Sequence, residues 1–228
     1  MKTHLEIAEK YLPVFWMDEK EPFTIDALGY TVFTEDAPSG SFQKRFLTAD
    51  WDRTKWLVEY AIWFDYDIQH LYELEHVWVY VGKDGKVWKV EGSFHGKFLN
   101  QVKLDTGEVS VDRDGIPEVY LQPGKHAIVP DKRVIALIPQ WQESCQELAG
   151  ADGLLVQDMF RDSLLAEDTE QTQEQVRRYI KDTYAFAPSM EFRPFRPDPS
   201  LLMAWQELKD SIPARLKKEL SVIRDSVK

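Results

Sequence analysis

Four carboxylates and two imidazoles lie within one twelve-residue segment of this 228-residue chain, Asp65 to His76. Side chains alternate between the two faces of an extended strand, so a strand that contains Glu73 and Glu75 places both on one face and His76 on the other. Two carboxylates so close together repel each other unless a proton or a cation lies between them. The segment therefore predicts a cation site at one end of an apolar strand face.

The residue types favour a hard divalent cation at this site. His70, in the turn before the strand, and either Asp65 or Asp67 would complete a ligand set with Glu73 and Glu75. Oxygen-rich ligation with one imidazole suits Mg²⁺, Ca²⁺ or Mn²⁺, whereas structural zinc sites prefer Cys and His. In the simpler alternative, the two glutamates lie on a solvated strand end and His70 caps a turn.

Two further histidines are candidates for acid–base chemistry beside such an ion. His95 and His126 each lie within two residues of a glycine, which permits close approach of the backbone to a site. Each could instead be an ordinary turn or core histidine. The chain contains no His-Glu-x-x-His, Gly-x-Ser-x-Gly or Walker pattern, and the acidic neighbours of Cys145 favour a structural thiol over a nucleophile.

The elements that must position these residues are mainly strands. Residues 55–67 and 75–81 are dense in aromatic and β-branched side chains, and an Asp-Gly turn at 83–86 leads into a further strand over 87–91. Further strands are expected within 28–34, 42–48, 118–121 and 128–138, and helices over 3–11, 153–165, 169–183 and 200–227. We therefore expect an antiparallel β-sandwich over residues 1–140 and a helical extension over 141–228 that packs on it.

Composition limits the classes of partner. The chain carries 28 basic and 39 acidic residues, a formal net charge of −11, which argues against nucleic acid or an anionic membrane as the main partner. A single cysteine cannot form an internal disulfide, so a reducing, cytoplasmic location is expected. No apolar run approaches 18 residues, so no integral membrane association is expected.

A short pattern resembles that of a known family. Residues 69–77, QHLYELEHV, are similar to the Gly-His-Arg-His-Asp-Trp-Glu-His-Val motif of the necrosis-inducing (cytolysin) family and to the shorter Gly-Asp-Trp-Glu-His-Val of a vacuolar-sorting-like family. Four other segments resemble family motifs in the same order, within about residues 5–135: 8–23, 63–67, 93–96 and 124–127. Glu73-Leu74 replaces Asp-Trp, and Tyr72 replaces the second histidine of the motif.

The resemblance implies a β-sandwich with a divalent ion at one end. Carried over position by position, the family's ligands fall on His70, Glu73 and Glu75, and its earlier aspartate falls best on Asp67, with Asp65 as the alternative. The cytolysins have a secretion signal and disulfides, neither of which is recognisable in this chain, so toxin activity is not expected.

Three functions follow as hypotheses. The first is a non-catalytic metal-binding protein whose ion organises a site for a polar or carbohydrate ligand, with Trp63, Trp78 or Trp88 stacking on the sugar. The second is a metal-dependent hydrolase that uses His95 or His126 as acid or base. The third is an interaction protein that docks through its C-terminal amphipathic helix. The first is the preferred one, and the sequence does not predict an oligomeric state.

Overall fold

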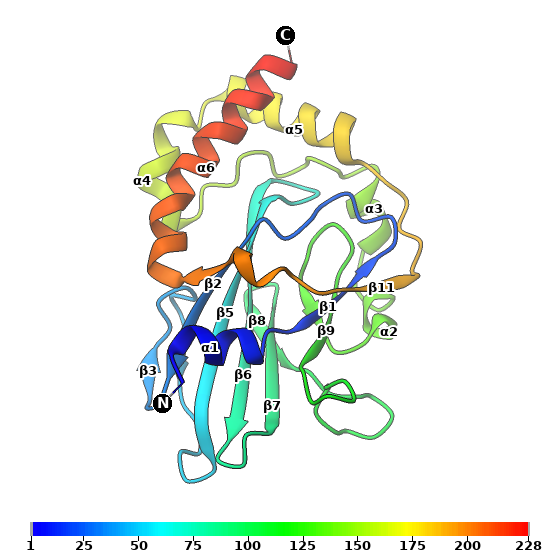
Figure 1. Ribbon diagram of the computed structural model, residues 1–228. Helices are drawn as coiled ribbons and strands as arrows, with labels where there is room; N and C mark the ends of the chain where they lie inside the picture. The colour runs from blue at the N-terminus through cyan, green and yellow to red at the C-terminus, as the bar shows by residue number, and fades with distance from the viewer. Residues whose placement is uncertain (1, 228) are drawn as a thin grey trace.

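A computed structural model describes residues 2–227 and shows two β-sheets beneath a layer of helices (Figure 1). The larger sheet has six strands in the order β12-β2-β5-β6-β7-β8. Their bounds are Leu202–Ala204, Ala27–Phe33, Thr54–Tyr66, Leu71–Gly82, Val87–Phe94 and Lys97–Asn100, respectively. The long central strands β5 and β6 match the aromatic and β-branched segments of the sequence.

The smaller sheet has four strands in the order β10-β9-β1-β11. These are Ile128–Val129, Glu118–Leu121, Val14–Asp18 and Phe192–Phe195, and a separate two-stranded ladder joins β3 (Ala37–Pro38) to β4 (Phe46–Leu47). Most neighbours are antiparallel, but β1 pairs with β9, and β2 with β12, in parallel. The expectation of strictly antiparallel sheets is therefore wrong, because segments far apart in the chain join β1 and β2 directly instead of through hairpins.

The two sheets share one hydrophobic core. Val77 and Val79 of β6 contribute to the same buried cluster as Phe15 of β1 and Ile128 of β10. Trp78 belongs to a different cluster on the opposite face of the large sheet. The predicted alternation along β6 is confirmed, and it places the glutamate-bearing face toward the smaller sheet.

The N-terminal helix is the one predicted from the sequence. The structure has α1 at His4–Lys10, where Thr3 and Glu6 form a reciprocal capping box. Other helices differ from expectation. The strand expected over 128–138 ends at Val129, because Pro130 interrupts it and Asp131 caps the short helix α2, Lys132–Ile135.

The remaining helices lie in the second half of the chain. They are α3 (Trp141–Cys145), α4 (Arg161–Leu164), α5 (Glu170–Tyr184) and α6 (Trp205–Ser226), with 3₁₀ turns η1 (Asp158–Phe160), η2 (Leu165–Glu167) and η3 (Pro199–Leu201). The long helix expected over 153–165 is reduced to two short turns, and part of the expected linker at 193–199 forms β11. The division of the chain near residue 140 stays a prediction.

Helix α6 covers the outer face of the large sheet. Its apolar side buries Leu208, Ile212, Leu216, Leu220 and Ile223 in one cluster with residues of β2, β5 and the start of β6. A proline inside a helix normally kinks or breaks it, yet α6 continues through Pro213 without interruption. Apolar residues buried on both sides of the proline offset its missing backbone hydrogen bond.

None of the helices within residues 2–227 combines the length and apolar character needed to cross a bilayer.

Replacing Ile212 by alanine should test the packing of α6 on the sheet. Ile212 is fully buried, so Ile212→Ala is expected to lower the free energy of unfolding by about 2–4 kcal/mol in a denaturant titration. Lys217→Ala, at an exposed position of the same helix, should change it by less than about 0.5 kcal/mol. Equal effects of the two substitutions would contradict the packing described.

Candidate metal centre

The second residue of β6, Tyr72, has a left-handed backbone conformation that helps to form the candidate site. Tyr72 has φ of 56°, which interrupts the alternation of side chains, and both Leu71 and Tyr72 are buried in the cluster under α6. The Tyr72 ring stacks on Trp63 with ring centroids 5.2 Å apart, and its hydroxyl donates to the Leu155 carbonyl at 2.9 Å. These contacts hold the backbone in its unusual conformation.

The Tyr72 carbonyl orients the imidazole of His70. His70 Nδ1 lies 2.8 Å from this oxygen, and because a carbonyl only accepts, Nδ1 carries the proton of a neutral ring. Nε2 then keeps its lone pair. A backbone carbonyl that accepts from one ring nitrogen while the other faces the ligand position is the usual arrangement of a metal-binding histidine.

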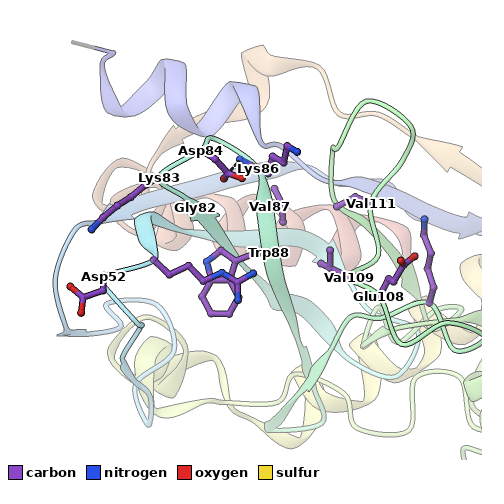
Figure 2. A pocket seen from close by; sticks show the side chains of 12 residues that line it. Asp52, Gly82, Lys83, Asp84, Lys86, Val87, Trp88, Glu108, Val109 and Val111 are labelled. Carbon is purple, nitrogen blue, oxygen red and sulfur yellow. Dashed lines mark hydrogen bonds between the residues drawn. The ribbon is translucent and has the colours of Figure 1, made fainter.

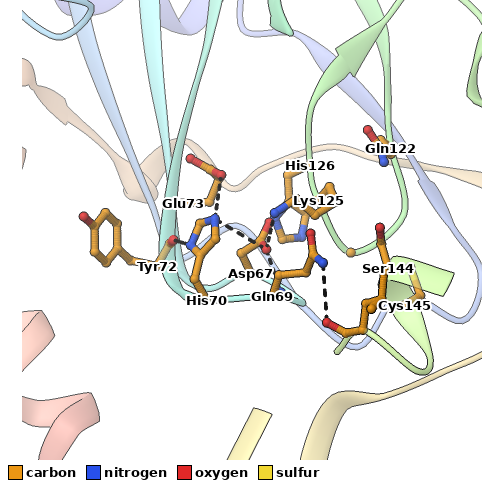
Figure 3. A network of polar contacts seen from close by, with 12 residues as sticks. Asp67, Gln69, His70, Tyr72, Glu73, Gln122, Lys125, His126, Ser144 and Cys145 are labelled. Carbon is orange, nitrogen blue, oxygen red and sulfur yellow. Dashed lines mark hydrogen bonds and ion pairs between the residues drawn. The ribbon is translucent and has the colours of Figure 1, made fainter. Parts of the chain in front are cut away.

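Two carboxylates face this nitrogen, as Figure 3 shows. Nε2 lies 3.6 Å from Asp67 Oδ1 and 3.5 Å from Glu73 Oε2. One ligand atom from each of Asp67, His70 and Glu73 lies within 4.8 Å of the other two. Asp67 and His70 are buried and Glu73 is half-buried, so the group opens to solvent on the Glu73 side.

A lysine already holds a positive charge at this position. Lys125 Nζ lies 2.9 Å from Asp67 Oδ1. Burial alone would raise the pKa of Asp67, but the charge and hydrogen bond of Lys125 bring it below its ordinary value. Burial likewise would lower the pKa of Lys125, and Asp67 more than reverses that effect. An ion bound at Asp67 Oδ1 would compete with this ammonium group, whereas Asp67 Oδ2 has no hydrogen-bond partner within residues 2–227.

Glu75, predicted as a fourth ligand, lies outside the cluster of three. Its carboxyl group is buried and bonded to the Ser93 hydroxyl, which also accepts from the His76 backbone N–H at 2.6 Å. Burial, followed by the nearby charges of Glu73 and Asp67, raises the pKa of Glu75 well above its ordinary value. Burial beside these carboxylates therefore favours the neutral form of Glu75, which lies behind the cluster.

The alternative ligand Asp65 points away from the cluster. It accepts from the Trp63 indole N–H at 2.7 Å and lies 3.6 Å from Arg215 of α6. Of the two aspartates left open by the sequence, the structure brings only Asp67 to His70 and Glu73.

The two catalytic candidates have different environments. His95 borders the same pocket as the cluster, and its Nε2 lies 2.9 Å from Gln122 Oε1. His126 is fully buried and stacks on Phe64 with centroids 3.8 Å apart. Both residues have positive φ, 46° and 58°. Only His95 is placed where it could contact a ligand.

The pocket above the cluster has a volume of about 430 Å³. The pairing of β6 with β7 stops at Val77 and Gly92, so the first residues of β6 pair with β5 on one side and have no strand partner on the other. Its walls include His70, Glu73, Glu75, His95 and Lys125 from the site, together with residues of the loops 41–44 and 157–159.

The tryptophans proposed for sugar stacking do not border this pocket. Trp63 and Trp78 are fully buried in hydrophobic clusters, and Trp88 lines a different hollow. The expectation is wrong for the first two, because their rings complete the cores on the outer face of the large sheet. Phe42, Leu74 and Met159 are the apolar side chains that do line the pocket.

No family model, curated protein or solved structure matches this chain. The resemblance to the cytolysin and vacuolar-sorting-like families therefore stays a prediction, and the candidate site rests on its geometry.

His76 should give the protein a measurable sensitivity to acid. Its ring is buried between Phe42 and Trp78, on the side of β6 opposite Glu75 as predicted, and burial lowers its pKa to about 3. The unfolded chain binds a proton near pH 6.5 and the folded chain does not, so stability is lost as pH falls from about 6.5 toward 3.

His76→Phe removes this loss. Urea titrations at pH 7.5 and pH 4.5 give the free energy of unfolding of both proteins. Over this drop in pH, the variant should lose about 2 kcal/mol less than the original chain. Other groups titrate in both proteins, so the difference between them isolates His76. Parallel pH dependences would show that the ring is not buried in its neutral form.

Proposed function

We propose that this protein binds a divalent cation through Asp67, His70 and Glu73 and holds a polar ligand beside it. The hydrogen bond from His70 Nδ1 to the Tyr72 carbonyl carries the proposal, since it turns Nε2 toward two carboxylates. The two sheets that share a core support the β-sandwich interpretation, as does the family resemblance of the segment around His70.

The donor set favours Mg²⁺, Ca²⁺ or Mn²⁺. Two carboxylates and one imidazole, without a thiolate, suit these hard ions. Three protein ligands leave further coordination positions, and these face the pocket on the Glu73 side. Hydroxyl groups of a carbohydrate or another polar ligand could fill such positions in place of water.

A metal titration of the chelator-treated protein tests the proposal. Binding at 100 times the dissociation constant should stabilise the fold by about 2.7 kcal/mol, or roughly 5–10 °C in melting temperature for a chain of this size. Glu73→Gln, which removes one charged ligand, should abolish most of the shift. Glu9→Gln, at an exposed position of α1, should keep it. No shift with any of the three ions would contradict the proposal.

Lys125→Met tests the competition between the ammonium group and the ion. Without the ion, the variant should melt at a lower temperature, because Asp67 and Glu73 then lose their positive partner in a buried site. Its affinity for Mn²⁺ should rise at least about tenfold by calorimetry, since no lysine has to leave. A weaker or unchanged affinity would place the ion elsewhere.

Hydrolysis at the same site is the second candidate. His95 borders the pocket and is exposed, so it can reach a ligand bound there as an acid or base. His126 is enclosed against Phe64 and does not reach the pocket. The interaction-protein alternative has less support, because α6 covers its own sheet with its apolar side.

A further inference from the structure

A second and larger hollow lies at the other end of the central strands. Its volume is about 670 Å³, and it is formed by the β6–β7 turn, the loop before β5 and the loop 103–111 (Figure 2). The candidate metal site lies at the start of β6 and this hollow at its end, Gly82. At about 3.3 Å per residue, the length of β6 separates the two by roughly 35 Å.

Positive charge gathers around this hollow in an otherwise acidic chain. Four basic side chains line it, Arg53, Lys83, Lys86 and Lys103, against three carboxylates. Among the ion pairs within residues 2–227, none includes any of the four. Their charges are therefore available to an anion from solvent.

The four basic side chains exceed the three carboxylates by one formal charge, and no ion pair joins the two groups within residues 2–227. Asp84 accepts from the Lys86 backbone N–H at 3.0 Å and so belongs to the β6–β7 turn. Asp52 and Glu108 lie on opposite sides of the hollow, with Trp88 between them (Figure 2). No pair of carboxylates therefore converges at its centre to repel an anion.

The guanidinium group of Arg53 is held in place by an aromatic ring. Its central carbon lies 4.2 Å from the centroid of the Trp88 ring, which in turn packs edge-on against Tyr80 at 5.6 Å. A stacked guanidinium keeps its N–H groups in a fixed plane, which suits two-point binding of an oxyanion such as phosphate. The lysines add mobile point charges around it.

The walls of the hollow can also receive an uncharged ring. Val87, Val109 and Val111 form an apolar side beside Trp88. A smaller neighbouring hollow shares Trp88 and Val109 and adds Asn100 and Gln101, whose Oε1 has no hydrogen-bond partner within residues 2–227. Amide groups next to a phosphate position suit the hydroxyl groups of a sugar.

We propose that the hollow around Arg53 and Trp88 is a binding site for a small phosphorylated sugar, with the phosphate held by Arg53 and the surrounding lysines. This site uses none of the residues of the metal centre, so either proposal can fail without the other.

Calorimetry of the full chain in metal-free buffer at constant ionic strength tests the site, with glucose 6-phosphate, glucose and inorganic phosphate as probes. Glucose 6-phosphate should bind, and glucose should bind at least about tenfold more weakly, because the phosphate supplies the charge-assisted hydrogen bonds. No binding of the phosphate ester at 10 mM, or equal binding of glucose, would overturn the proposal.

Two double variants separate the site from general charge. Lys83→Gln/Lys103→Gln removes two exposed lysines of the hollow, and Lys97→Gln/Lys217→Gln removes two exposed lysines outside it. Circular dichroism and melting temperature should show that both variants remain folded. The first should lose affinity for glucose 6-phosphate at least about tenfold and the second less than about twofold. Equal losses in the two variants would show only a response to net charge and would overturn the site.

Discussion

The antiparallel pairing of β5 with β6 is the interaction on which the rest of the molecule depends. It runs from Tyr66 and Leu71 at one end to Thr54 and Gly82 at the other. One face of this ladder meets the smaller sheet, and the other carries α6 and the β3–β4 ladder. The connection at one end contains the candidate metal ligands, and the second hollow lies at the opposite end. A shift of one residue in this register would move each side chain of the shifted strand to the opposite face and so separate the residues of both candidate sites.

The candidate metal centre illustrates how a buried negative charge is balanced by a side chain of the same protein. Asp67 is fully enclosed, and its negative charge is tolerated because Lys125 lies within hydrogen-bonding distance. The same lysine contacts only Oδ1 of this carboxylate and leaves Oδ2 without a hydrogen-bond partner within residues 2–227. Glu75 differs from Asp67 in this respect, since burial near two carboxylates favours its protonated, uncharged form.

The local parts of this arrangement could be predicted from the sequence. Strand alternation placed Glu73 and Glu75 on the face of Val77 and placed His76 with Trp78, and both placements are confirmed. The N-terminal helix and α5 match the helices expected over residues 3–11 and 169–183. The separation of Glu75 from the cluster could not be predicted, because it depends on Ser93 in another strand.

The features that could not be predicted from the sequence depend on contacts between residues far apart in the chain. Lys125 and Asp67 are 58 residues apart in the sequence, and the residues next to Lys125 in the sequence do not indicate that it pairs with this carboxylate. The left-handed conformation of Tyr72 depends on Trp63 and on a carbonyl more than eighty residues away. The short strands β11 and β12 have no pattern of their own and exist because β1 and β2 offer open edges.

These two edge strands also bear on how the chain is made. β11 completes the smaller sheet and β12 the larger one, and both lie after residue 191, so they leave the ribosome after all the other strands of the two sheets. Until then β1 and β2 expose unpaired backbone groups, and the face later covered by α6 is bare. Such edges and apolar faces are where nascent chains associate with one another. Both sheets and the face under α6 are therefore complete only once residues 192–226 have been translated.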